Sequence, residues 1–141
     1  MNELLVLDAW AILAFLQKEE PAASRVLQIL QEADRRKLKL NISIINLGEV
    51  YYRIGRVKGR KEAEETLKSL YKLPLQVLPA TDQIVLEAAA LKMEWAISYA
   101  DAFAAAEARR LNGTLVTGDP ELLQMKGVFR VEKLKRKESF E

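Results

Sequence analysis

The sequence contains neither cysteine nor histidine. Without cysteine the chain has no disulfide, no thiolate nucleophile and no zinc–thiolate site, which agrees with a reducing compartment. Without histidine it cannot use an imidazole as base, acid or metal ligand, and this excludes Ser-His-Asp triads and the histidine-dependent, metal-free ribonuclease mechanisms. Any catalysis by this chain therefore depends on carboxylates, hydroxyls, lysines or a bound metal ion.

The sequence also has no apolar run of membrane-spanning length. Its first segment is apolar, but Glu3 and Asp8 interrupt it and no basic segment precedes it. The apolar stretch from Ala9 to Leu16 is far shorter than the about 20 residues that a bilayer span needs. We therefore expect a cytoplasmic protein that does not insert into a membrane.

Neither sign of charge dominates, because 22 Lys and Arg face 20 Asp and Glu, a formal net charge of +2. Any binding to a polyanion must then depend on local clusters. Basic residues do cluster in three places: Arg35, Arg36, Lys37 and Lys39; Arg53, Arg56, Lys58, Arg60 and Lys61; and Lys133, Lys135, Arg136 and Lys137. Such runs are usually solvated faces, although the second has added weight because its helix also carries Glu49.

Aromatic residues are few, at 7% of the chain. Some of them could stack on nucleic-acid bases, but their apolar surroundings favour a place in the core or in a dimer interface. These are Trp10, Tyr51, Tyr52 and Trp95.

The length and composition fit one domain. The chain has 141 residues, of which 50% are hydrophobic and 30% charged, and this is enough apolar material for one core. We expect that domain to occupy residues 1–132, and residues 133–141 to form a charged C-terminal tail that frays.

Apolar patterning predicts five short strands separated by helices. The strands are expected at residues 4–7, 38–42, 75–78, 114–117 and 129–131. The helices are expected at residues 9–16, 21–33, 44–57, 60–71, 82–91 and 99–112, three of them capped by Ser43, Thr81 and Ser98. This alternation predicts an α/β fold with a mostly parallel sheet of about five strands flanked by helices, whose site lies beyond the carboxyl ends of the strands.

Four acidic residues are expected at that edge of the sheet. Asp8 directly follows the first strand, and Asp119 lies two residues after the fourth. Asp101 begins a helix that runs antiparallel to the fourth strand, and Glu49 lies in the second turn of the helix that leaves the second strand. Carboxylates that lie close together raise one another's pKa, so such a cluster must be protonated or hold a cation. An oxygen-only ligand set predicts Mg²⁺ or Mn²⁺ rather than zinc.

Each acid also has a purely structural interpretation. Asp8 and Asp119 are placed to cap helices, the second with Pro120 in the first helical position. Asp101 fits the acidic position of a capping box opened by Ser98. Glu49 is too far into its helix for a cap, but it is placed to pair with a cation four residues later.

Four motifs resemble the PIN domain, as found in the toxin subunits of VapBC-type toxin–antitoxin systems. They are LVLDAWAILAFL, ISIINLGEV, SYADAFAAAEA and LVTGDPEL, in the order and at about the distances usual in that family, and together they extend over essentially the whole chain. The resemblance implies a metal-binding acidic site of Asp8, Glu49, Asp101 and Asp119, supported by the hydroxyl of Thr117. One departure is that Gly118 and Pro120 stand where basic residues are frequent in the family.

The resemblance further implies an endoribonuclease that uses one or two Mg²⁺ or Mn²⁺ ions, forms a homodimer and is blocked by a cognate antitoxin. The alternative of another class is a non-catalytic PIN-like module that binds RNA or a protein. A receiver domain fits poorly because no acidic pair follows Asp8 and no Asp closes the third strand. A haloacid-dehalogenase-type phosphatase fits poorly because Trp10 stands where it would have a second Asp.

Overall fold

Five parallel strands form one sheet in residues 3–137, the part of the chain that the computed structural model describes. The strands are β1 (Glu3–Leu7), β2 (Leu38–Ser43), β3 (Gln76–Leu78), β4 (Thr114–Thr117) and β5 (Arg130–Lys133). Their order across the sheet is β3-β2-β1-β4-β5, and all four pairings are parallel. The sheet is thus wholly parallel, where the sequence predicted a mostly parallel one.

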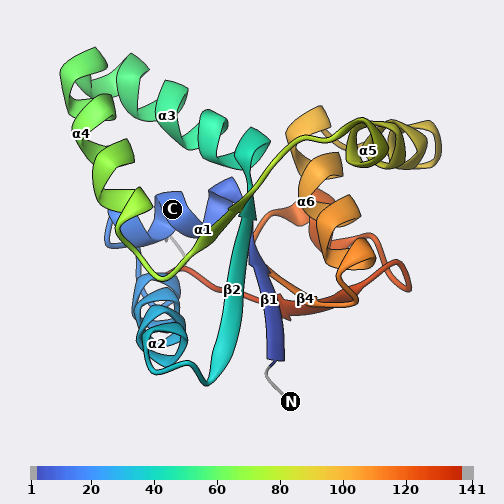
Figure 1. Ribbon diagram of the computed structural model, residues 1–141, viewed down its shortest axis with the longest axis horizontal. Helices are drawn as coiled ribbons and strands as arrows, with labels where there is room; N and C mark the ends of the chain where they lie inside the picture. Colours follow the sequence, from blue (N-terminus) through green and yellow to red (C-terminus); the bar gives the residue numbers. More distant parts are fainter. Residues whose placement is uncertain (1–2, 138–141) are drawn as a thin grey trace.

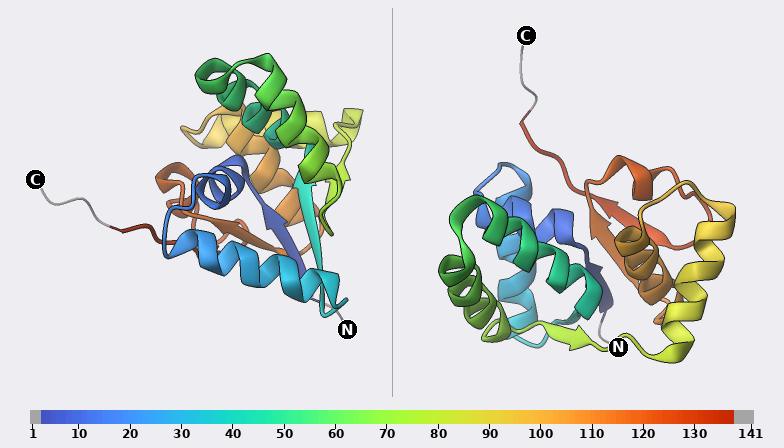
Figure 2. Two further views of the ribbon diagram at one scale, coloured as in Figure 1. Left: turned by 90° about the vertical axis from the view of Figure 1, so that its left-hand side faces the viewer. Right: turned by 90° about the horizontal axis from the view of Figure 1, so that it is seen from above.

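The described residues form seven helices, and Figure 1 shows helices on both faces of the sheet. The first four pack into one core: α1 (Ala9–Leu16), α2 (Ala22–Asp34), α3 (Ile44–Lys58) and α4 (Arg60–Tyr71). The others pack into a second core: α5 (Asp82–Glu94), α6 (Tyr99–Arg110) and the short α7 (Pro120–Leu123). The two views of Figure 2 show the same division, with α5 and α6 on the side opposite α1 and α2. None of the helices in residues 3–137 is long and apolar enough to cross a membrane.

The position of β1 in the sheet explains why its residues form a continuous apolar run in the sequence. Leu5 and Leu7 belong to the core under the first four helices, whereas Val6 belongs to the core under α5 and α6. Successive side chains of a strand point to opposite faces, so a strand covered on both faces must be apolar at every position. Because β1 lies between β2 and β4, the ends of these three strands meet at one edge of the sheet.

The strands and helices predicted from the sequence are present, with ends shifted by a few residues. Helices 9–16 and 60–71 and strand 114–117 have the predicted bounds. The segment after strand 114–117 contains the short helix α7, with Asp119 as its cap and Pro120 in the first helical position, which is the structural interpretation that the sequence allowed.

The packed part of the chain extends beyond residue 132. Leu134 is 3% exposed, and its backbone N–H donates to the carbonyl of Thr117 at 2.8 Å. Arg136 then pairs with Pro21 in an isolated antiparallel bridge. Of the expected charged tail, residues 138–141 lie outside the described residues, so fraying there stays a prediction.

Gly113, which directly precedes β4, provides a test of how closely β4 must approach β1. A Cβ at this position would lie 2.8 Å from the carbonyl oxygen of Leu4, a backbone atom that cannot move aside. Gly113→Ala should therefore lower the free energy of unfolding by about 1–3 kcal/mol, as expected for overpacking. The matched control is Gly48→Ala in α3, where no atom lies within 4 Å of the added Cβ and where removing a helical glycine should stabilise by about 0.5–1 kcal/mol. Urea unfolding of both variants measures the two signs, and a Gly113→Ala protein as stable as wild type would contradict the described contact.

Candidate metal centre

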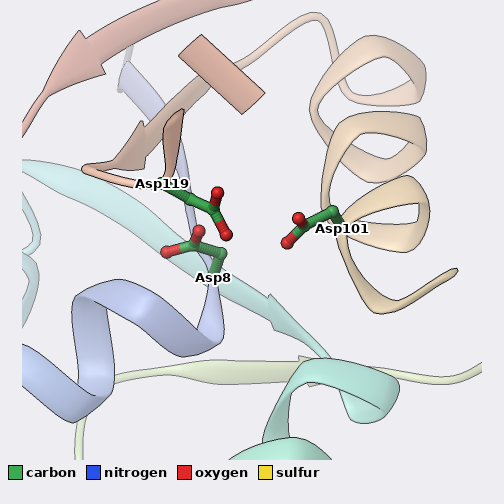
Figure 3. Close-up of side chains that lie close together, drawn as sticks. All are labelled: Asp8, Asp101 and Asp119. Atoms are coloured by element: carbon green, nitrogen blue, oxygen red, sulfur yellow. The ribbon is translucent and has the colours of Figure 1, made fainter. Parts of the chain in front are cut away.

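Three aspartates from different elements point into one space at the carboxyl edge of the sheet (Figure 3). Asp8 follows β1, Asp119 follows β4, and Asp101 lies in the first turn of α6. One carboxylate oxygen from each of the three lies within 4.8 Å of the others. The structure therefore brings together three of the four acids that the sequence placed at this edge.

The fourth acid, Glu49, lies outside this group. Its carboxylate accepts a hydrogen bond from the Arg53 guanidinium at 2.9 Å, one helical turn further along α3. The side chain of Glu49 is 16% exposed, so it is largely covered without joining the three aspartates. This contact is the structural interpretation that the spacing of the two residues allowed.

Capping and clustering occur together at the three aspartates. Asp8 caps α1 by accepting from the backbone N–H of Ala11 at 2.9 Å. Asp119 caps α7 by accepting from the backbone N–H of Glu121 at 2.9 Å. A carboxylate has about four lone-pair sites, so one cap bond leaves most of its capacity free. The capping interpretation and the cluster interpretation of these residues are thus not alternatives.

Thr117 connects two members of the cluster. Its hydroxyl, which is fully buried, donates to Oδ2 of Asp8 and accepts from the backbone N–H of Asp119 at 3.0 Å. The first bond fixes the rotamer of the Asp8 carboxylate, and the second fixes the loop that carries Asp119. The structure therefore gives Thr117 the supporting contact that the resemblance implied.

Asn46 is a supporting residue whose role the sequence did not reveal. It is 1% exposed and lies in the first turn of α3. Its side-chain oxygen accepts from the backbone N–H of Ala9 at 3.1 Å, and its Nδ2 donates to the carbonyl of Ala100 at 3.0 Å. Ala9 follows Asp8 and Ala100 precedes Asp101, so Asn46 fixes the distance between these two acids. The signal in the sequence is that Asn46 lies three residues before Glu49 on the same face of its helix, which by itself does not identify a partner.

Glu121 is a second supporting residue that sequence reasoning missed. Its carboxylate accepts from the backbone N–H of Ser98 at 3.1 Å and shares a hydrogen bond with the carboxyl group of Asp101. Ser98 in turn caps α6 by accepting from the backbone N–H of Asp101 at 3.1 Å. No signal in the sequence distinguishes Glu121 from the ordinary acidic residues of first helical turns.

Burial, with smaller contributions from neighbouring carboxyl groups, raises the pKa values of Asp8 and Asp101. Burial raises the pKa of Asp8 to about 7, with a smaller contribution from Asp119, although hydrogen bonds from Thr117 and Ala11 oppose this rise. The pKa of Asp101 rises to about 9 because of burial, the hydrogen bond to Glu121 and the nearby charges of Asp119 and Asp8. The same hydrogen bond, together with the one from the backbone N–H of Ser98, lowers the pKa of Glu121.

These residues fit a hard divalent cation. A cation between the three carboxylates would remove the repulsion among them, and carboxylate oxygens are the ligands that Mg²⁺ and Mn²⁺ prefer. The free lone pairs of Asp8, Asp101 and Asp119 are available for such an ion, whereas the cap bonds and Thr117 keep two of the carboxylates in place. The donor set contains no nitrogen or sulfur ligand, which makes a zinc site unfavourable.

Trp10 explains the missing basic residue after Thr117. A Cβ on Gly118 would clash with three carbons of the Trp10 ring, so the ring fills the space that a side chain at position 118 would need. The guanidinium of Arg136 lies over the same ring, 5.4 Å from its centroid. A basic group is thus present at this place, but the C-terminal segment provides it.

The model of the PIN domain family matches residues 5–128. The chain therefore belongs to the PIN domain family, and the described five-stranded parallel sheet with its flanking helices is that single domain. No protein with a curated function matches the sequence.

Solved structures with the same fold include toxin–antitoxin complexes. VapBC2 from Rickettsia felis bound to a DNA fragment from its promoter has a TM-score of 0.73 at 17% identity, over 94% of this chain and 99% of that chain. DNA-bound VapBC from Salmonella typhimurium has a TM-score of 0.71 at 19% identity, over 94% and 98%. VapBC-1 from nontypeable Haemophilus influenzae has a TM-score of 0.67 at 20% identity, over 92% and 97%. At these identities the comparison shows a shared fold.

The raised pKa values predict how the stability of the metal-free protein depends on pH. Folded Asp8 and Asp101 bind protons up to about pH 7 and about pH 9, whereas in the unfolded chain they release them near pH 3.8. The folded state thus binds more protons across this range, and its stability falls as pH rises, for Asp8 alone by on the order of 4 kcal/mol. We expect the melting temperature to fall between pH 5 and pH 9, and Asp8→Asn to melt higher than wild type at pH 8 without metal.

The same samples with Mg²⁺ separate a metal site from a set of caps. Mg²⁺ should raise the melting temperature of wild type, with a stabilisation of about 2.7 kcal/mol at a hundred times its dissociation constant, and that of Asp8→Asn much less. Asp82→Asn, which changes an exposed acid on α5, is the matched control and should respond as wild type does. If millimolar Mg²⁺ leaves wild type unchanged and Asp8→Asn melts no higher without metal, the three aspartates do not form a metal site.

Proposed function

We propose that this PIN domain is a metal-dependent endoribonuclease and the toxin of a toxin–antitoxin pair. The observation that supports this most is a set of three aspartates, buried Asp8 and Asp101 and half-buried Asp119, whose carboxylate oxygens converge within 4.8 Å although their charges repel. The caps account for Asp8 and Asp119 singly, but bringing the three charges together costs stability, so a cation-dependent function is the physical reason to keep the cluster. The absence of histidine agrees with hydrolysis that depends on carboxylates and metal.

In this proposal the side chains keep the reacting groups in position, and the bound cation would supply the positive charge. One or two bound Mg²⁺ or Mn²⁺ ions would activate water and stabilise the phosphate in an in-line displacement, leaving 5′-phosphate and 3′-hydroxyl ends. Asp8, Asp101 and Asp119 hold the ion, and Thr117 keeps the Asp8 carboxylate in one orientation. Asn46 keeps the start of α1 and the start of α6 at a constant distance, which preserves the geometry that a displacement in line requires.

Glu49 completes the acidic site in this proposal, as the resemblance implies. Its carboxylate is paired with Arg53, so this role requires that the ion pair be exchanged for the cation or for a water bound to it. The pair also favours the second candidate function, a non-catalytic module that binds RNA or protein, because a three-acid group without Glu49 would hold an ion less tightly. The cleavage assay below decides between the two.

We further propose a cognate antitoxin and a homodimer. The similar structures include VapBC complexes, and a FitAB complex from the same fold class is also bound to DNA. Helix α5 presents an apolar face made of Leu86 and Met93, which are 70% and 85% exposed and lie seven residues apart. Two helical turns bring these side chains onto one face, and an exposed apolar face of this kind favours association.

RNA cleavage tests the nuclease and separates the caps from the ligands. The purified protein should cleave RNA with Mg²⁺ or Mn²⁺ and stop when EDTA is added, because the site has only oxygen ligands. Ser98→Ala should cost about 1 kcal/mol of stability through the lost cap but keep turnover per folded molecule, whereas Asp101→Asn should abolish turnover. Activity that survives exhaustive chelation would refute the mechanism, and RNA binding without cleavage in metal would favour the non-catalytic module.

The mass in solution tests the homodimer. Light scattering after gel filtration should give twice the mass of the 16.0 kDa chain, and changing both Leu86 and Met93 to Glu should give the monomer mass, because two charges cannot be buried in an apolar interface without partners. The control is Leu27→Glu on α2, an exposed apolar residue on the other side of the sheet. A wild-type monomer would remove the dimer and leave the nuclease proposal unaffected.

A further inference from the structure

A groove of about 660 Å³ lies beside the aspartate cluster and has no role in the proposed chemistry. Its lining residues come from α1 and the segment after it, from α3 and α4, and from the C-terminal segment at Arg136. The floor is apolar, with Leu13, Leu16 and Ile54, and the rim is basic. This combination of an apolar floor and a charged rim is typical of a binding site rather than of a packing defect.

Two residues of the groove wall contact the surroundings of the acidic site. Trp10 lines it, and the ring of Trp10 lies against Gly118, between the two residues that hold the site together on β4, Thr117 and Asp119. On α3, Arg53 lines the groove and binds Glu49. Through Trp10 the groove therefore borders the loop that carries Asp119, although the aspartates themselves are not among its lining residues.

The positive charge of the rim indicates a negatively charged ligand in the groove. Four cationic side chains line the groove: Arg53, Arg56, Lys58 and Arg136. Glu19 is the only acid among the lining residues, and it pairs with Arg136 at 3.1 Å. Within residues 3–137, neither Arg56 nor Lys58 has an acidic side chain at ion-pair distance, so both charges are available to a polyanion.

We propose that this groove holds single-stranded RNA, with phosphates at Arg56, Lys58 and Arg136 and bases against Trp10 and the apolar floor. The inference rests on the proposed nuclease function and assigns to it a substrate path. An unpaired strand exposes both its phosphates and the flat faces of its bases, which matches a basic rim over an apolar floor with an aromatic ring. Arg136 already lies over the Trp10 ring, so an incoming base exchanges one stacking partner for another at small cost.

Tryptophan fluorescence tests occupancy of the groove directly. The chain has two tryptophans, so Trp95→Phe leaves Trp10 as the single reporter. Asp101→Asn in the same protein prevents cleavage during the titration. Adding a single-stranded RNA oligonucleotide should quench or shift the emission of Trp10, and the double variant Arg56→Glu with Lys58→Glu should weaken binding by about tenfold or more and reduce the slope of log affinity against log salt by about one to two.

A matched charge reversal controls for long-range electrostatics. Arg35→Glu with Lys37→Glu changes the net charge by the same amount on exposed residues outside the groove, and it should leave binding close to that of the parent. In the cleaving protein, the reversal at Arg56 and Lys58 should raise KM with little change in kcat and leave the Mg²⁺-induced rise in melting temperature intact. That last readout distinguishes a lost RNA contact from damage to the aspartate cluster.

The outcomes separate this proposal from the proposed function. If the oligonucleotide binds without changing Trp10 emission, and the two reversals weaken binding equally, RNA does not occupy the groove and a protein segment becomes its candidate occupant. If the variant with both Arg56 and Lys58 reversed cleaves RNA with an unchanged KM, the proposal that RNA binds in the groove is wrong, and the nuclease proposal is unaffected. If binding follows the groove but the wild-type protein never cuts RNA with metal present, the nuclease proposal fails and the RNA site remains.

Discussion

Repulsion among Asp8, Asp101 and Asp119 is the constraint on which the arrangement of this domain depends. Bringing three carboxylates into a site that is largely closed to water costs free energy, which appears as the raised pKa values of Asp8 and Asp101. The fold offsets part of that cost by placing Asp8 at the N-terminus of α1 and Asp101 in the first turn of α6, where the helix dipoles favour negative charge. The remaining cost is what a cation would remove.

The hydrogen bonds around the cluster form a nearly continuous path. It runs from Asp8 through Thr117 to Asp119, and from there through Glu121 and Ser98 to Asp101. Asn46 links the starts of α1 and α6 on the opposite side. Because each step uses a buried or backbone group with a defined partner, the acids cannot separate to relieve their repulsion without breaking several bonds. This rigidity preserves the geometry that metal-dependent chemistry needs.

The contact between Trp10 and Gly118 shows how one side chain alters the use of neighbouring positions. With the indole ring against the backbone of residue 118, no side chain fits there, and the nearby positive charge comes from Arg136 in the C-terminal segment. The same ring forms one wall of the basic groove. The position of the Trp10 ring therefore has two consequences. Residue 118 in the loop after β4 has no room for a side chain, and an indole ring forms part of the groove.

The sequence by itself determined the elements and three of the site residues, because strand periodicity, caps and strand ends are local properties that place Asp8 and Asp119 at one edge of a parallel sheet. Asp101 followed from the direction of a helix that leads straight into β4. The spacing of Glu49 and Arg53 already allowed their ion pair, but only the tertiary structure decided that Glu49 lies outside the aspartate group. The tertiary structure also decided the contacts of Asn46, which spans two helix starts, and of Glu121, which reaches across to α6, because no local pattern encodes a partner on another element. The order of residues determines local features such as caps and strand ends, whereas the packing of helices and strands determines which side chains pair between elements.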